Sequence, residues 1–550
     1  MTVDADKTIK LYQELMSEKS NFTTFFQEVT DYILPYASNT RQWESPGTRR
    51  GVERYDSTAV EACERRSASL GTTLTNASSK WFQLQAEDDH LREDSDVSSW
   101  LEASAERMYD ALAQSNFYTQ IDEAFLDLAG YGTACLDAMS KGLSISRGFQ
   151  GLKFRAWPIR EYVFAEGPDG IVNETLRSTR LSPLQAMAEF GALPGFKGLG
   201  KRMTAALDEA ASRGPASKAY ERHEIIHHVY PRHTRDPLHR KFSKNFEWGS
   251  AYIAAEDKHL IWESGFVERP FGLARWRKNA DDGGWGRGPG LTAMPTIRSL
   301  NAFQKNMLKA AEKDVDPPLL IENKGVIGSI RTRAKGITYK RRGAEIDFLH
   351  SGTNFNFGMA ELSDMRAAVK RMFHVEQIDA LMGEPTPNMT AFEFGKRVDM
   401  ARQQLGSTFG RLQQELLDPV ILRVFGLMAR SGQLPMPPEA LQGSVNLKVE
   451  YVGPLARAQR SSEVDAIHQA YEFGAFLSQA TGDPSPLDVL NGQKAQRHAS
   501  RILGVPSDII RGEEEVAGLQ EARSQQAQEQ TAIEQADTLA GAAQKVGSIA

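Results

Sequence analysis

Hydrophobic positions near the start of the chain recur every three or four residues, a spacing that predicts an amphipathic helix. Between residues 7 and 34 this stripe comprises Ile9, Tyr12, Leu15, Met16, Phe22, Phe25, Phe26 and Val29, and Pro35 ends it. Similar patterns predict helices at about 56–75 and 97–131. From 150 to 275 the pattern changes to short β-like runs separated by Pro and Gly, so we expect an α+β protein.

The middle of the chain predicts two helices that flank one β-rich excursion. The first begins after Gly288-Pro289 and ends at Asp316-Pro317-Pro318. A compact β-like stretch follows, with Gly325, Gly336 and Gly343 at its predicted turns. The second helix runs from about 359 to 382 and stops at Gly383.

The C-terminal third again predicts mostly helix. Thr390 and Glu393 have the spacing of a capping box at the start of a long helix, which Pro419 should bend rather than end. The run NLKVEYV predicts a short strand, and residues 456–510 read as helices. The last forty or so residues have few large apolar groups and predict at best a peripheral helix.

Composition places the chain among soluble globular proteins with more than one packed unit, since 550 residues exceed the size of a single hydrophobic core. No apolar run reaches the ~18 residues of a membrane helix, and the first residues lack a signal peptide's hydrophobic segment. We therefore expect a cytoplasm-like compartment and no membrane. Cys63 and Cys135 resemble no paired-ligand motif and are expected to be small core residues.

One stretch raises the possibility of a zinc enzyme, because His223, Glu224 and His227 spell H-E-x-x-H and His233 follows where a third ligand would lie. That chemistry needs a helix, which brings the two imidazoles to one ion. Here β-branched residues alternate and Pro231 follows, so we expect a strand, in which residues four apart are separated by about 13 Å. A zinc metalloenzyme using 223–227 remains the alternative function.

No other motif nominates an enzyme. The stretch GFKGLGKR, residues 195–202, has Arg202 where a P-loop needs Ser or Thr, and a predicted helix rather than a strand precedes it. No spacing of Ser, His and acid predicts a nucleophile. We therefore expect no catalytic residues, no metal and no cofactor.

Charge is unevenly distributed. The net charge of −6 does not favour a protein that grips nucleic acid by neutralising phosphates. Between residues 323 and 343, however, seven basic residues occur without an acid: Lys324, Arg331, Arg333, Lys335, Lys340, Arg341 and Arg342. They form either the solvated face of a hairpin or a surface that contacts DNA or an acidic partner.

The order of these parts resembles the portal proteins, or head-to-tail connectors, of short-tailed (podovirus-type) bacteriophages. Three stretches carry the resemblance: WGRGPGLTAMPTIRSLN (285–301), KDVDPPLLI (313–321) and NMTAFEFGKR (388–397). Weaker likeness covers 55–84 and 227–232, so the resemblance extends over nearly the whole chain up to about residue 460. The remainder matches least.

The resemblance implies the portal fold, α+β but mainly α, which assembles as a ring of usually twelve copies. The expected parts are a wing (1–286 and 390–455), stem helices (287–313 and 358–383), a β-rich clip (314–357), a tunnel loop (384–389) and a helical crown with the C-terminal tail (456–550). The tunnel loop, Glu384, Pro385, Thr386, Pro387, Asn388 and Met389, would project into a channel for double-stranded DNA.

The resemblance also implies partners and a place of action. The ring would occupy one capsid vertex of the virion, where the genome is packaged and later ejected, after assembly in the host cytoplasm. Its partners would be the terminase large subunit, then tail adaptor proteins, with the major capsid and scaffolding proteins around it. A third possible function is that of a virion structural protein without a channel. The order of the predicted elements, which is helix, β excursion, helix and proline-containing loop, favours the portal instead.

Overall fold

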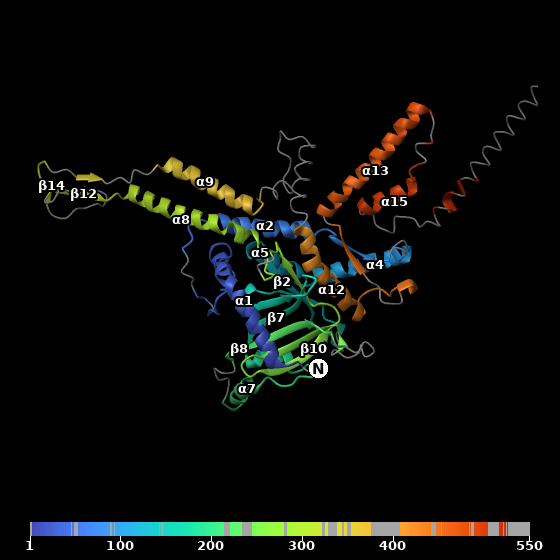
Figure 1. The fold of residues 1–550 in the computed structure, drawn as a ribbon, viewed down its shortest axis with the longest axis horizontal. Helices are drawn as coiled ribbons and strands as arrows, with labels where there is room; N and C mark the ends of the chain where they lie inside the picture. The colour runs from blue at the N-terminus through green and yellow to red at the C-terminus, as the bar shows by residue number, and fades with distance from the viewer. Residues whose placement is uncertain are drawn as a thin grey trace, which may run out of the picture. The chain divides into compact units, whose positions relative to one another are not determined.

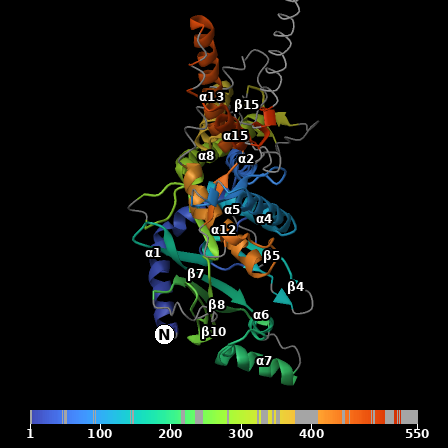
Figure 2. The same cartoon turned by 90° about the vertical axis from the view of Figure 1, so that its right-hand side faces the viewer.

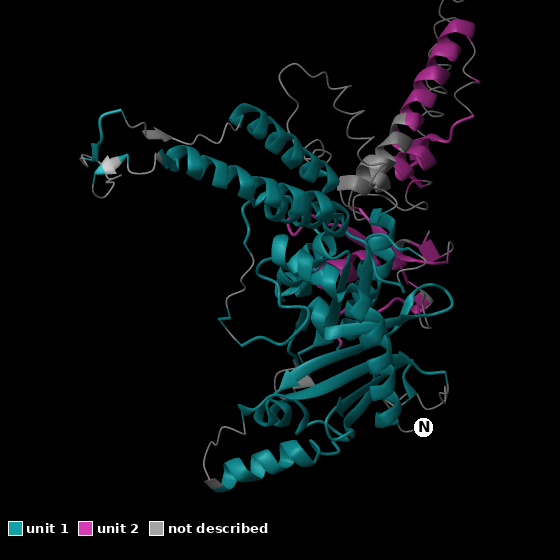
Figure 3. Cartoon of the chain, turned by 60° about the vertical axis from the view of Figure 1, so that its left-hand side comes forward, with its two compact units in different colours: residues 1–75, 111–431 teal, residues 76–110, 432–550 magenta. Residues whose placement is uncertain are grey.

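The computed structural model describes residues 3–213, 220–233, 245–279, 283–327, 338–343, 346–348, 354–375, 408–441 and 447–503, with short gaps inside these ranges, and a few positions between 516 and 525 (Figure 1). The chain forms two compact units, residues 1–75 with 111–431 and residues 76–110 with 432–550 (Figure 3). Its described residues are mixed α and β with helix predominating, as the sequence predicts.

The first unit contains a five-stranded antiparallel sheet. Its strands occur in the order β10 (His259–Phe266), β9 (Trp248–Ala254), β8 (His223–Pro231), β7 (Val172–Leu181) and β6 (Tyr162–Glu166). Side chains of a strand alternate between faces. Ile226 therefore packs toward helix α1 (Ala5–Tyr32), while Ile225 packs toward α6 (Pro183–Phe190) and α7 (Lys201–Arg213) on the opposite face (Figure 2).

The glycine-rich stretch 195–202 connects α6 to α7. Ser182 caps α6 through a capping box with Gln185, and Pro183 occupies the first turn, as the sequence predicts. Arg202 lies in α7, where its guanidinium pairs with the Glu256 carboxylate at 2.9 Å. The stretch follows a helix, which is not the context of a P-loop.

The first unit also contains a sheet of three antiparallel strands. It comprises β11 (Phe271–Arg275), β2 (Thr133–Ser140) and β5 (Leu152–Ala156). Short strands β3 (Leu143–Ser144) and β4 (Gly148–Phe149) pair beside it, and a single 3-10 turn, Ile159–Glu161, precedes β6. Cys63 and Cys135 are both buried and unpaired in the core, which confirms that they are core residues.

Helix α5 (Phe117–Gly130) packs on β2 and β5 of this second sheet, and α2 (Thr58–Leu74) packs on α5 in turn. The prediction of one helix over 97–131 is wrong, because α4 (Ser95–Ala113) and α5 are separate. The reason is tertiary: the Asn116 side chain donates to the Phe154 carbonyl at 2.8 Å and accepts from the Phe154 N–H at 2.9 Å, which fixes the connection against β5.

Pro419 lies where the sequence predicts a bend within a helix. A π-helical turn, Gln413–Leu417, leads directly into α12 (Asp418–Arg430), whose first turn contains the proline. Proline has no N–H to offer the carbonyl four residues earlier, that of Glu415. The Arg269 side chain donates to this carbonyl instead, at 3.3 Å, so the carbonyl oxygen still accepts a hydrogen bond where the helix bends. The predicted start of the long helix, from Thr390, lies outside the described residues.

The second unit contains the two-stranded antiparallel sheet of β1 (Phe82–Ala86) and β16 (Leu447–Tyr451). The Tyr109 hydroxyl accepts from the N–H groups of Trp81 and Phe82, both at 2.7 Å. A 3-10 turn, Glu439–Leu441, precedes β16, and helices α13 (Pro454–Thr481) and α15 (Gly492–Leu503) follow it. The strand and the helices agree with the sequence-based expectation.

Candidate functional site

The H-E-x-x-H residues lie on strand β8, which confirms the predicted strand. Their imidazoles have separate partners: His223 Nδ1 lies 3.3 Å from the Glu256 carboxylate, and His227 Nε2 lies 3.0 Å from the Ser250 hydroxyl. His227 also stacks on Tyr252 with ring centroids 4.0 Å apart, and burial lowers its pKa to about 3. The motif therefore supplies hydrogen-bonded sheet residues with separate partners, and this geometry does not favour a zinc enzyme.

The candidate site is the pair of helices α8 (Pro289–Val315) and α9 (Phe355–Met372), together with the β-rich tip that joins them (Figure 1). Ile297 and Leu300 of α8 share one buried cluster with Leu362 and Val369 of α9. Ile297 and Leu300 are three residues apart, and Leu362 and Val369 are seven apart. Each pair therefore lies on one face of its helix. The two helices are thus held together by their apolar stripes.

The second helix differs from its predicted bounds. It begins at Phe355, where Asn354 accepts from the Phe357 N–H at 3.2 Å, and it ends at Met372 rather than near 382. The next turn contains His374, whose φ of 58° is left-handed and therefore incompatible with continuing the helix. The apolar pattern alone did not reveal this stop, because nothing in it distinguishes His374 from a helical position.

The tip consists of two short antiparallel pairs. Strand β12 (Leu319–Ile321) pairs with β15 (Ile346–Phe348), and β13 (Val326–Ile327) pairs with β14 (Tyr339–Lys340). Next to the β13–β14 pair, the Arg341 N–H donates to the Gly325 carbonyl at 2.9 Å. The described residues between the two helices thus pair as short strands, as the sequence predicts.

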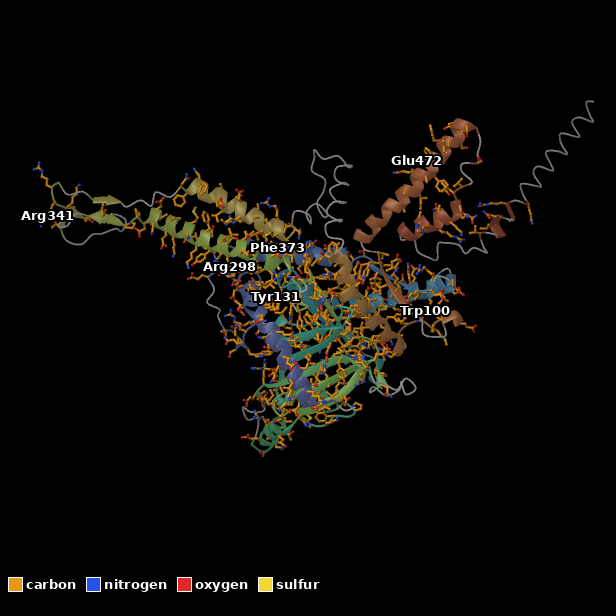
Figure 4. The ribbon with its side chains drawn as sticks, in the orientation of Figure 1. Trp100, Tyr131, Arg298, Arg341, Phe373 and Glu472 are labelled. Carbon is orange, nitrogen blue, oxygen red and sulfur yellow. The ribbon has the colours of Figure 1, made fainter. Side chains whose placement is uncertain are left out.

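The basic residues that the structure describes at this tip are all exposed. Lys340 lies on β14, and Arg341 and Arg342 follow it in a turn, with Arg341 projecting from the far end of the tip (Figure 4). The other predicted members, Lys324, Arg331, Arg333 and Lys335, lie outside the described residues, as does the whole predicted tunnel loop, Glu384–Met389. The structure therefore brings together three of the predicted site residues.

The sequence reading missed a second property of this region, the exposure of its large apolar side chains. Val315 is 86% exposed, Tyr339 68% and Phe357 65%. The full set on the helix pair and tip, called the apolar rim below, is Leu308, Val315, Leu320, Ile327, Tyr339, Phe357 and Met359. Exposed apolar residues gathered in one region mark a surface that binds another protein.

The segment before α2 ties both helices to the body of the unit. The Tyr55 N–H donates to the Asn301 side chain of α8 at 2.7 Å. The Asp56 carboxylate accepts from Arg366 of α9 at 2.9 Å and from the Thr58 N–H at 2.9 Å. Burial raises the pKa of Asp56, but the hydrogen bonds from Thr58 and Arg366 outweigh this and hold it below its ordinary value.

We expect Asp56→Asn to lower the free energy of unfolding by about 1–3 kcal/mol at pH 7. Because the folded-state pKa of Asp56 is lowered, its stabilisation is complete above the unfolded pKa and is lost as pH falls through the folded one. Urea unfolding at pH 7 and pH 3.5 measures this, and the difference between variant and parent should shrink at the lower pH. Glu28→Gln, which breaks the exposed 3.3 Å pair with Arg298, is the control and should change little.

Comparison with known proteins agrees with this architecture. Residues 5–510 match the family model described as "Bacteriophage head to tail connecting protein". The chain is similar to the "Portal protein" of Salmonella phage epsilon15, with 26% identity over 537 residues, covering 96% of this chain and 92% of that protein. It is likewise similar to the "Probable portal protein" of Bordetella phage BPP-1, with 27% identity over 553 residues, covering 98% of this chain and 94% of that protein.

Proposed function

Because the chain belongs to the bacteriophage head-to-tail connecting protein family, and so serves as the portal through which the phage genome is packaged and ejected, we propose that it works as a ring of twelve copies. The observation that carries the ring is the apolar rim on the helix pair and tip. In a single chain these side chains face water, and burying them against neighbouring copies is the driving force that a ring requires.

Electron microscopy of the purified full-length protein tests this proposal. Class averages should show rings with a central hole, and their rotational symmetry gives the copy number. Particles of a lone 61 kDa chain under conditions where the protein is folded would contradict self-assembly into a ring.

The wing, stem, clip, tunnel-loop and crown assignments follow as parts of the same proposal. Helices α8 and α9 correspond to the two stem helices, the tip between them to the clip, and α13 with α15 to the crown. The net charge of −6 per chain suits a channel that must let DNA slide, since strong phosphate contacts would resist movement. The portal itself would do no chemistry, and the terminase would supply the energy for packaging.

The exposed basic tip is proposed as a docking surface for an acidic region of the terminase large subunit or, later, of the tail adaptor proteins. Lys340, Arg341 and Arg342 are consecutive and all exposed, so positive charge is concentrated on one small surface. Such a surface steers association with an acidic partner. Weak contact with the DNA backbone is the second role open to the same residues.

Reversing the charges in Arg341→Glu/Arg342→Glu should weaken binding of the terminase or the adaptor by about tenfold or more and leave folding and ring formation unchanged. Surface plasmon resonance at two salt concentrations measures this, with Lys313→Glu, an exposed change in the last turn of α8, as the control. If the wider reversal that adds Arg331→Glu and Arg333→Glu left motor binding and DNA packaging intact, neither role would stand.

The loop Glu384–Met389 is proposed as the narrowest part of the channel. Pro385 and Pro387 restrict the conformations of this segment, which suits a constriction of fixed width. Deleting Thr386 to Asn388 should leave ring assembly unchanged and reduce the amount of DNA retained in filled heads. Failure of the rings to assemble would instead give the loop a structural role.

The proposed place of action is the portal vertex of the virion, reached by assembly with the major capsid and scaffolding proteins in the host cytoplasm. None of the helices that the structure describes is long and apolar enough to cross a membrane.

A further inference from the structure

Arg66 is buried in the core of the first unit without a hydrogen-bonding partner. It lies in the middle of α2 and is 0% exposed. Its guanidinium carbon lies 4.7 Å from the ring centroid of Trp276 and 6.0 Å from that of Phe409. Its Nε, Nη1 and Nη2 atoms have no acceptor among the described residues.

Contact with aromatic rings stabilises the flat faces of the Arg66 guanidinium but gives its N–H groups no acceptor. A guanidinium presents its two flat faces to rings, but its five N–H donors point outward in the plane and need acceptors. A buried charge without them costs several kcal/mol of desolvation. Burial lowers the pKa of Arg66 to about 9, and no acidic group among the described residues compensates its charge.

A second unpartnered group lies nearby, at the end of helix α9. The Nδ1 atom of His374 is buried and has no hydrogen-bonding partner among the described residues. Burial, followed by the charges of Arg66 and Arg277, lowers the pKa of His374 to about 4. The two arginines are thus close enough to act on its imidazole, and His374 is neutral at pH 7.

The backbone at this place is also unusual. His374 has a φ of 58°, in the left-handed region that a non-glycine residue adopts at a cost. This turn ends α9, which packs against α2, the helix that carries Arg66. Figure 4 marks the neighbouring residue, Phe373, at the end of α9. The helix that carries Arg66 and the helix that ends at the His374 turn therefore pack together where the helix pair joins the body of the unit.

We propose that Arg66 and His374 form a binding site for a small oxyanion of the phosphate class. The guanidinium fork binds two oxygens of one anion, and a neutral imidazole with its proton on Nδ1 donates to a third. Arg277, which is exposed, adds positive charge near His374. Because Arg66 is completely buried, the site suits a small ion and excludes the backbone of a DNA duplex. An anion held there links α2 to the end of α9 and stiffens the base of the helix pair.

Thermal unfolding of the full-length protein in phosphate tests this, with chloride replacing phosphate at constant ionic strength and constant protein concentration. The parent protein should gain about 2 °C or more in Tm at saturating inorganic phosphate, along a hyperbolic dose curve. Arg66→Met should show no such gain, whereas Arg66→Lys, which keeps the charge and loses the fork, should show a smaller one. Arg65→Met changes the neighbouring exposed arginine on the same helix and should respond like the parent.

The chloride buffer provides an independent outcome. If Arg66 has no partner in the protein, replacing it with methionine removes an uncompensated charge, so Arg66→Met should melt at or above the parent temperature without phosphate. A variant that unfolds, or melts several degrees lower, would show that a protein acceptor already holds Arg66. That result, or equal phosphate responses of parent and Arg66→Met, or no response of the parent, would overturn the site.

Discussion

Replacing Val315 and Ile327 together with aspartate is expected to abolish ring formation while each chain remains folded. These side chains are 86% and 56% exposed in the single chain, so the substitution removes almost no packing within it. In a ring, burial of a large apolar side chain contributes about 1.5–3 kcal/mol, and an unpaired carboxylate in its place adds a desolvation cost. Because each copy contributes both sides of a repeated contact, the loss recurs at every interface.

Light scattering after gel filtration, together with electron microscopy, measures the outcome, and circular dichroism checks the fold. Met436→Asp is the matched control, since Met436 is 93% exposed but lies away from the apolar rim along the chain. Rings from the double variant that are as abundant and stable as those of the parent would show that the apolar rim is not the interface between copies.

The second large effect is expected inside the unit, where removing the Glu415 carboxylate by Glu415→Ala should cost about 3–5 kcal/mol of unfolding free energy. Its oxygens accept from Arg275 Nε at 3.1 Å, Nη2 at 2.6 Å and the Arg275 N–H at 3.0 Å. The Arg275 side chain is only 1% exposed, and Glu166 shares it. Although burial lowers the pKa of Arg275, its bonds and charges with Glu415 and Glu166 raise it overall.

Losing Glu415 would leave a buried guanidinium with incomplete compensation, which is why the expected cost is large. Urea unfolding of the full-length protein measures it. Glu61→Gln, which breaks the exposed 2.9 Å pair with Arg65, should stay within about 1 kcal/mol of the parent. If Glu415→Ala cost no more than this control, Glu166 alone would suffice to hold Arg275.

Local sequence patterns predict some elements of this fold well. The helix pair was predictable because an apolar stripe of helical period lies between a helix-starting Gly288-Pro289 and the stop at Asp316-Pro317-Pro318. The strand character of residues 223–231 was equally readable from alternating β-branched residues. In each case the rule is local, since neighbouring residues alone determine which backbone conformation costs least.

The errors arose where distant residues decide. Asn116 ends the run that begins near residue 97 because its amide bonds to Phe154 of another segment. Leu308 lies on α8 at helical spacing from the buried Leu300 but is 48% exposed, because the exposure of a helical position depends on what packs against it. The basic residues at the tip were identified from sequence, while the exposed apolar residues beside them were not, since a strand pattern does not reveal whether another layer covers the strand.

By itself, then, the sequence determined the class of fold, most helix and strand positions, and, through its ordered motifs, the resemblance to phage connectors. Only the tertiary structure decided which polar side chains find partners: Glu415 for Arg275, Asp56 for Arg366, and none among the described residues for Arg66. The reason is physical. Backbone conformation follows from interactions over a few residues, whereas the energy of a buried charge depends on groups that lie tens or hundreds of positions away along the chain.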